Sequence, residues 1–149
     1  MLLLENADPG SSLRIVSKPG DRLPIHCTAS GKAILAFLPP VQARSILRSA
    51  GMPAFTPHTI TSMEAMEAAL EQIRAQGFAV EDGETRIGLR SVAAPVFDIN
   101  GTPRYAISVL GMFRRTSTPE FQAAQELVQT AARFVSKELG YSYLLTRRS

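Results

Sequence analysis

Apolar side chains recur three and four residues apart along four stretches of the chain, the spacing that places them on one face of an α-helix. We therefore predict helices over residues 29–37, 41–49, 61–76 and 118–139. Three of these helices have a threonine at their start, and a threonine hydroxyl can accept a hydrogen bond from a first-turn N–H group: Thr28, Thr61 and Thr118.

Two further signals define the ends of the longer helices. Glu64 follows Thr61 at the spacing of a capping box, which favours Thr61 as the cap of the third helix. Gly77 and Gly140 are expected to end the third and fourth helices, because glycine readily takes the left-handed conformation found after a helix. The fourth helix has the longest apolar stripe, which we expect to be buried: Phe121, Ala124, Leu127, Val128, Ala131 and Val135.

Short apolar or alternating segments bounded by turn residues predict the strands. They cover residues 1–6, 13–17, 91–97 and 104–112, with a further strand beginning at Phe78. Turn residues at 8–12 and 98–101 predict hairpins between strands that are neighbours in the sequence. Since hairpins outnumber crossovers, we predict an α+β domain with helices packed on an antiparallel sheet.

Composition places the chain among soluble globular domains. Its 149 residues suit one domain, and 45% hydrophobic content with a net charge of +3 excludes global disorder. No apolar run approaches the roughly 20 residues of a membrane span. The first residues, MLLLE, lack the basic start and the length of a signal peptide. The single cysteine suits a reducing compartment, so a cytoplasmic location is expected.

The basic excess does not by itself indicate nucleic-acid binding. Sixteen lysines and arginines give a sequence pI near 9.4, but they are scattered, with clusters only at residues 114–115 and 147–148. No DNA-reading helix-turn-helix, ribbon or finger is evident. We therefore interpret these arginines as solvated surface and tail.

His26 and Cys27 raise the possibility of a thiol nucleophile. Such a nucleophile needs a base oriented against the sulfur, whereas neighbours on an extended segment point to opposite sides. We therefore predict no catalytic residue and a core position for Cys27. Two histidines and one cysteine without ligand spacing also predict no metal site, and no phosphate-loop pattern is present.

Several polar residues remain as candidates for binding. Glu81, Asp82 and Glu84 could act in acid–base chemistry, but an acidic loop between strands is more often a solvated turn. Serine hydroxyls in otherwise apolar stretches could anchor a ligand in an apolar pocket, or serve as small core residues: Ser30, Ser91 and Ser108.

Three stretches resemble one known family. Residues 23–33 read LPIHCTASGKA, similar to the pattern LPxHxTAxGKA of the IclR family of bacterial transcription regulators. The second hallmark of that family is similar to GFAVE at 77–81, Glu84, and GLRSVAAPVFD at 88–98. The following strand resembles AISV at 106–109 with Gly111 after it. The resemblance covers nearly the whole chain.

The resemblance implies a GAF-like effector-binding domain that senses a small molecule and self-associates as a dimer or tetramer. It implies no cofactor and no enzyme activity. Members of the family contact operator DNA through an N-terminal winged helix-turn-helix, which is absent from this sequence. We therefore expect residues 1–149 to be the effector-binding domain without its N-terminal part.

Carried over by position, the resemblance also implies a set of ligand contacts. The expected polar and helix-start contacts are Ala29, Ser30, Glu81, Ser91, Ser108 and Leu110, with Ile15 and Leu23 as apolar wall. Members of the family usually have Asp or Ser at position 81, and often Cys at 91 and Ser at 110. The start of the helix at residue 29 presents free N–H groups, which favours a small organic acid, aromatic acids included, as the ligand.

Two alternatives remain open at this point. The chain could be a small hydrolase or thiol enzyme that uses Cys27, in which case Cys27→Ala would abolish turnover. It could also be a stand-alone ligand-binding module with no role in DNA binding.

Overall fold

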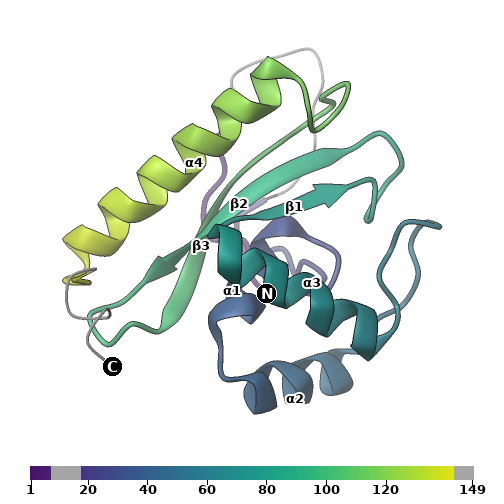
Figure 1. Cartoon of the computed structure of the whole chain (residues 1–149), viewed down its shortest axis with the longest axis horizontal. Helices are drawn as coiled ribbons and strands as arrows, with labels where there is room; N and C mark the ends of the chain where they lie inside the picture. The colour runs from purple at the N-terminus through teal and green to yellow at the C-terminus, as the bar shows by residue number, and fades with distance from the viewer. Residues whose placement is uncertain (8–17, 143–149) are drawn as a thin grey trace.

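The computed structural model describes residues 1–7 and 18–142 of the chain. In these residues a three-stranded antiparallel sheet lies between the helices, as Figure 1 shows. The strands are β1 (Ala79–Asp82), β2 (Arg90–Phe97) and β3 (Pro103–Gly111), in the order β1-β2-β3. With helices on both sides of the sheet, the α+β prediction is confirmed.

Four helices were predicted and the described residues form them: α1 (Ala29–Phe37), α2 (Pro40–Ala50), α3 (Met63–Gln76) and α4 (Pro119–Glu138). Thr28 caps α1 and Thr118 caps α4 through their hydroxyls, as predicted. The predicted cap of α3 is wrong. Ser62, not Thr61, accepts the N–H of Ala65 at 3.2 Å, because the helix begins one residue later than the capping-box spacing suggests.

The prediction of a strand over residues 1–6 is wrong. Among the described residues this segment makes a single antiparallel bridge, between Leu2 and Arg22. Backbone bonds from Leu3 to Asp21 at 3.0 Å and from Leu23 to Met1 at 2.9 Å hold it beside residues 20–23. The turn at 8–12 and the strand at 13–17 lie outside the described residues.

The two faces of the sheet pack against different helices because successive strand residues point to opposite sides. Val92 and Val96 of β2 pack under α4 against Phe121 and Val128. Ala93 lies on the other face, beneath α1 and α3. Figure 1 shows α4 alone along one face and α1, α2 and α3 together on the other.

The buried stripe of α4 is shifted from the predicted one. Leu127 is 69% exposed, and the helix instead buries Ala132 and Ser136. The Ser136 hydroxyl accepts the Phe97 N–H at 3.0 Å and donates to the Ala132 carbonyl at 2.7 Å. This contact fixes the rotation of α4 and leaves Leu127 on its outer side.

No helix in residues 1–7 and 18–142 combines the length and apolar character needed to cross a bilayer.

Candidate functional site

The start of α1 is held by a tight turn. Thr28 Oγ1 donates to the Pro24 carbonyl at 2.7 Å and accepts the Gly31 N–H at 3.2 Å. The first N–H to bond a carbonyl at this end of the helix is that of Lys32, which reaches Thr28 at 3.0 Å. The N–H groups of Ala29 and Ser30 have no partner among the described residues. Two N–H donors at the positive end of the helix dipole therefore have no hydrogen-bond acceptor among the described residues.

Gly31 permits this turn to pack against α1. A Cβ atom at position 31 would lie 2.1 Å from the backbone oxygen of Ile25. That separation is far below any van der Waals contact, so only glycine fits here.

The strand register places three of the predicted contacts directly beside one another on neighbouring strands. Glu81 pairs with Ser91 across β1 and β2, and Ser91 pairs with Leu110 across β2 and β3. Ser108 lies opposite Ala93, two residues along on the same face. This is the face that α1 covers, so these four predicted residues are on one side of the sheet.

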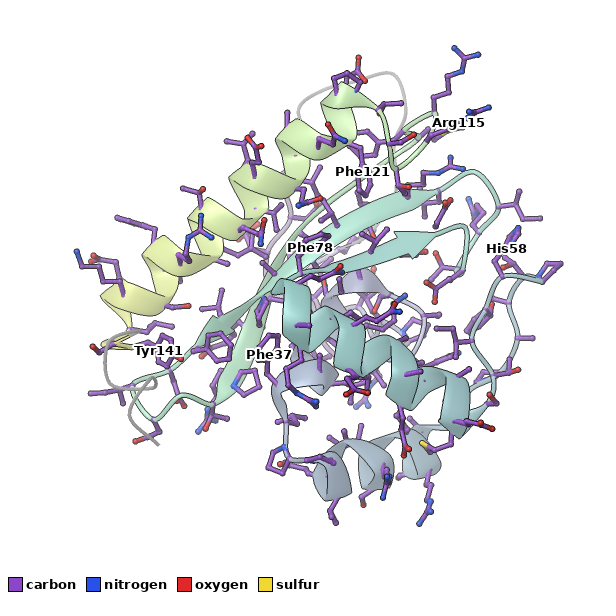
Figure 2. All side chains as sticks on the ribbon, in the orientation of Figure 1. Phe37, His58, Phe78, Arg115, Phe121 and Tyr141 are labelled. Carbon is purple, nitrogen blue, oxygen red and sulfur yellow. The ribbon has the colours of Figure 1, made fainter. Side chains whose placement is uncertain are left out.

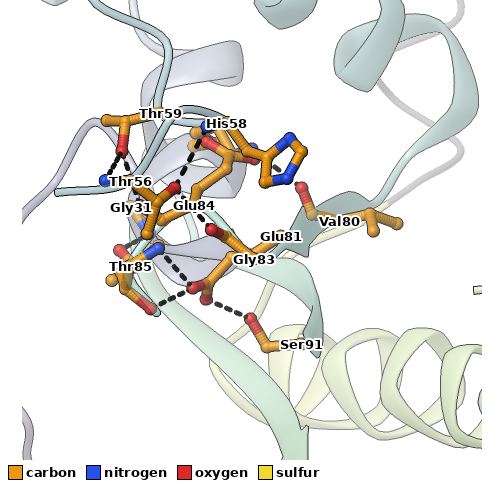
Figure 3. Close-up of polar contacts among 12 residues, drawn as sticks. Gly31, Thr56, His58, Thr59, Val80, Glu81, Gly83, Glu84, Thr85 and Ser91 are labelled. Atoms are coloured by element: carbon orange, nitrogen blue, oxygen red, sulfur yellow. Dashed lines mark hydrogen bonds and ion pairs between the residues drawn. The ribbon is translucent and has the colours of Figure 1, made fainter. Parts of the chain in front are cut away.

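Glu81 is buried, with both carboxylate oxygens occupied. One oxygen accepts the Thr85 N–H at 3.1 Å and the Thr85 hydroxyl, and the other accepts the Ser91 hydroxyl at 2.8 Å (Figure 3). Because Ser91 donates its proton to Glu81, that hydroxyl can only accept a further hydrogen bond. The pair therefore presents lone pairs rather than donors.

Glu84 forms a second buried acidic group beside Glu81. Its carboxylate is paired with the Lys32 ammonium from α1, and Lys32 also donates to the Val80 carbonyl at 2.8 Å. The other Glu84 oxygen, Oε2, is buried without a hydrogen-bond partner. The solvated-turn interpretation is therefore wrong for Glu81 and Glu84. Asp82 is exposed, but it ends strand β1 and forms an ion pair with Arg90 at 2.7 Å.

Threonines of the 51–62 loop keep Glu84 in place. The Thr59 hydroxyl donates to the Glu84 carbonyl at 2.6 Å, and the Thr56 hydroxyl donates to the Gly83 carbonyl at 2.6 Å (Figure 3). Sequence reasoning did not assign these residues, nor Lys32 or Thr85. The lysine in the GKA motif was the available signal, since a lysine within an apolar helix face needs a buried partner.

Burial raises the pKa of the Glu84 carboxyl, and the nearby Lys32 ammonium opposes this shift only in part. The carboxylates of Glu81 and Asp82 add to the increase, because they repel a further negative charge. The Lys32 ammonium thus pairs with only one of the two buried carboxyl groups, that of Glu84.

A raised pKa has a defined effect on stability. The folded state holds the Glu84 proton more tightly than the unfolded chain, whose value is near 4.5. The contribution of Glu84 to the free energy of unfolding is therefore fully present below about pH 4.5, and it decreases as the pH rises through the raised pKa. We expect the free energy of unfolding, relative to that of Glu84→Gln, to decrease from pH 4 towards neutrality, as measured by urea denaturation. An increase over that range would contradict the assignment.

Cys27 lies beneath this cluster and is fully buried. Burial, reinforced by the charges of Glu81 and Glu84, raises the pKa of its thiol to about 12. The ring of His26 bonds the Pro53 carbonyl through Nε2 at 2.9 Å, not the sulfur. A thiolate nucleophile is therefore disfavoured, and the core position predicted for Cys27 is confirmed.

The remaining predicted contacts differ in exposure. Ala29 is buried, whereas Ser30 and Leu23 are half-buried. Ser108 and Leu110 are exposed on β3, and Ile15 lies outside the described residues. Two surface hollows are present elsewhere, one along α2 and one between α3 and α4, and neither is lined by a predicted contact. In residues 1–7 and 18–142, no group of three His, Cys, Asp or Glu side chains could hold a metal ion.

Comparison with known proteins identifies the family. Residues 1–137 match the family model for the C-terminal region of bacterial IclR transcriptional regulators. The regulator BhcR of Paracoccus denitrificans (strain Pd 1222) is 36% identical over 136 residues, which cover 91% of this chain and 49% of BhcR. The chain spans about half the length of the curated relatives it matches.

Solved structures of transcriptional regulators are also similar to this chain. The Thermotoga maritima IclR is similar with a TM-score of 0.86 and 33% identity, over 94% of this chain and 57% of that chain. A double mutant of the PobR inducer-binding domain from Acinetobacter, in complex with 3-hydroxybenzoic acid, is similar with a TM-score of 0.71 and 25% identity, over 90% and 77%. These neighbours are consistent with the GAF-like fold that the sequence motifs imply.

The relatives also decide between the classes of function left open by the sequence. The family and its matched members are transcriptional regulators, not enzymes, which removes the reading of Cys27 as a nucleophile. With the family model covering residues 1–137, the chain belongs to the IclR family of bacterial transcriptional regulators, as a C-terminal domain.

Proposed function

We propose that this domain binds a small organic acid, whose binding controls DNA recognition by a separate domain of the regulator. The observation that carries the proposal is the pair of N–H groups at Ala29 and Ser30, which have no partner within residues 1–7 and 18–142 and lie on the face of the sheet that holds Ser91 and Ser108. Two free N–H groups at a helix start suit a carboxylate. The complex of the PobR domain with a hydroxybenzoic acid supports this ligand class.

The ligand would lie with its carboxylate at the start of α1 and its apolar body between Leu23 and Leu110. The exposed Ser108 hydroxyl can donate to the ligand from β3. The internal bonds of Glu81 reduce its conflict with an anion, because three donors already neutralise part of its charge. The proposed contacts are thus Ala29, Ser30, Ser108, Leu23 and Leu110, with Ser91 and Glu81 behind them and Ile15 as further wall.

Calorimetric titration with a panel of aromatic and aliphatic acids tests this site. Ser108→Ala should weaken the best ligand about 3- to 10-fold, and up to roughly 100-fold if the hydroxyl contacts the carboxylate. Ser30→Asp should weaken it more, since it places a fixed negative charge beside the ligand carboxylate.

Ser45→Asp is the matched control, because it makes the same change at an exposed position of α2. It should leave the affinity unchanged. Equal affinity of the native chain and Ser30→Asp for the best acid would place the ligand elsewhere.

The proposal extends to assembly and location. We infer that residues 1–149 act as the effector-binding and self-association part of the regulator, as a homodimer or homotetramer in the cytoplasm. Operator DNA would be contacted only through a separate domain. The exposed apolar side chains Leu127 and Phe134 on α4 support the expectation that this surface is covered in the assembled protein.

A further inference from the structure

A groove at the far end of α1 is independent of the site proposed above. It measures about 530 Å³, within the size range of small-molecule sites, and lies between the C-terminal ends of α1 and α3 and the C-terminal half of α4. The groove follows from the topology. β1 pairs with β2 only as far as Ala93, so the edge of β2 from Ala94 to Phe97 has no β1 partner.

Small residues keep this groove open. Gly77 ends α3 in the left-handed conformation, with φ of 83°, and a Cβ there would lie 3.7 Å from Nε2 of Gln129 on α4. Ala94 and Ala132 line the groove from β2 and α4 without reaching across it. Longer side chains at these positions would fill the space.

Two arginines from different helices line the groove. Arg74 comes from α3 and its Nε donates to the Ala36 carbonyl at 2.7 Å, whereas Arg133 comes from α4 and donates to Thr130 at 3.2 Å. Each has five N–H donors, of which one has an acceptor in the part of the chain that the structure describes. Among the described residues no acidic side chain lines the groove, and neither arginine is in an ion pair.

An aromatic group forms one end of the groove. Phe97 stacks on Tyr141 with ring centroids 4.9 Å apart, and Phe37 meets Phe97 edge-on at 5.3 Å. Figure 2 shows Phe37 and Tyr141 near the lower end of α4. A planar ring can pack against such a group at similar distances.

We propose that this groove binds an aromatic carboxylate, with its charge between Arg74 and Arg133 and its ring towards Phe97 and Tyr141. Paired guanidinium donors match carboxylate oxygens, and the groove offers a surplus of donors with no competing acid. The nine residues of α1 span about 14 Å, so this second site and the start of α1 are at opposite ends of one helix.

The test uses phthalate as the probe and amide NMR spectra of the ¹⁵N-labelled chain. Titration should shift the signals of Gly77 and Gly101, which line the groove. Phthalate should bind at least about tenfold more tightly than succinate, which lacks the ring, or benzamide, which lacks the charge. Equal binding of all three would overturn the proposal.

Variants of the two groove arginines test where phthalate binds. Arg74→Gln and Arg133→Gln should each weaken phthalate about tenfold or more, since each removes charged hydrogen bonds. Arg48→Gln on α2 is the matched control and should have no effect. Ser30→Asp should also leave the shifts at Gly77 and Gly101 unchanged, which separates this site from the one at the start of α1. Unchanged affinity in both groove variants, or an equal loss in Arg48→Gln, would refute the site.

Discussion

Gly31→Ala is expected to destabilise the domain by about 3 kcal/mol or more. In an ordinary helix this change would stabilise by roughly 1 kcal/mol. Here the added Cβ would lie 2.1 Å from the Ile25 oxygen, and backbone atoms on both sides cannot rotate away as a side chain could. Either α1 or the turn before it must move. Urea denaturation followed by circular dichroism measures the loss.

Gly88→Ala is the control for this substitution. Gly88 has φ of 85° and open space around its Cβ position, so the change tests backbone strain without a clash. We expect a cost of about 1–2 kcal/mol. If Gly31→Ala lowers the free energy of unfolding no more than Gly88→Ala does, the turn packs less tightly on α1 than the 2.1 Å separation indicates.

Lys32→Met should cost about 3–5 kcal/mol at neutral pH, because it leaves the buried carboxylate of Glu84 unpaired beside Glu81. The methionine chain fills similar space, so the loss reports the missing charge and hydrogen bonds. Without the ammonium, the pKa of Glu84 should rise further. The variant should therefore regain part of its stability as the pH is lowered and Glu84 is protonated, as measured by chemical denaturation from pH 4 to 8.

Two further variants test the interpretation. Lys32→Met/Glu84→Gln should be more stable than Lys32→Met alone at neutral pH, because the unpaired charge is removed with its partner. Arg44→Met breaks the exposed pair with Glu67 and should have little effect. A Lys32→Met chain as stable as the native one would show that the buried pair is not needed.

Local signals predicted most of the fold. Hydroxyl caps at Thr28 and Thr118, and helix-ending glycines at 77 and 140, act within one turn of the chain and are readable from the sequence. The rotation of α4 is not, because it depends on the bond between Ser136 and the distant Phe97 N–H. The pairing of residues 1–3 with 20–23 likewise depends on contacts beyond the nearest predicted hairpin.

The electrostatics of the candidate site could not be predicted from the sequence. The strand register brings Glu81, Ser91 and Ser108 to one face of the sheet, whereas their contact with a ligand stays a prediction. Acidic residues in a loop normally indicate solvent exposure, but Glu84 is paired with Lys32 from a helix 52 positions earlier in the chain. Such a long-range pair of charges leaves no periodic signal.

Because Cys27 is buried, the reactivity of its thiol can report local opening motions of the chain. Cys27 is the only cysteine, it has no exposed surface, and the charges of Glu81, Glu84 and Lys32 act on its thiol. A thiol reagent can therefore react only during openings of this region, and the labelling rate gives the free energy of those openings when closing is fast. Any compound that tightens the start of α1 would slow the reaction, so a single absorbance trace could screen acids without a radiolabel, a fluorophore or DNA.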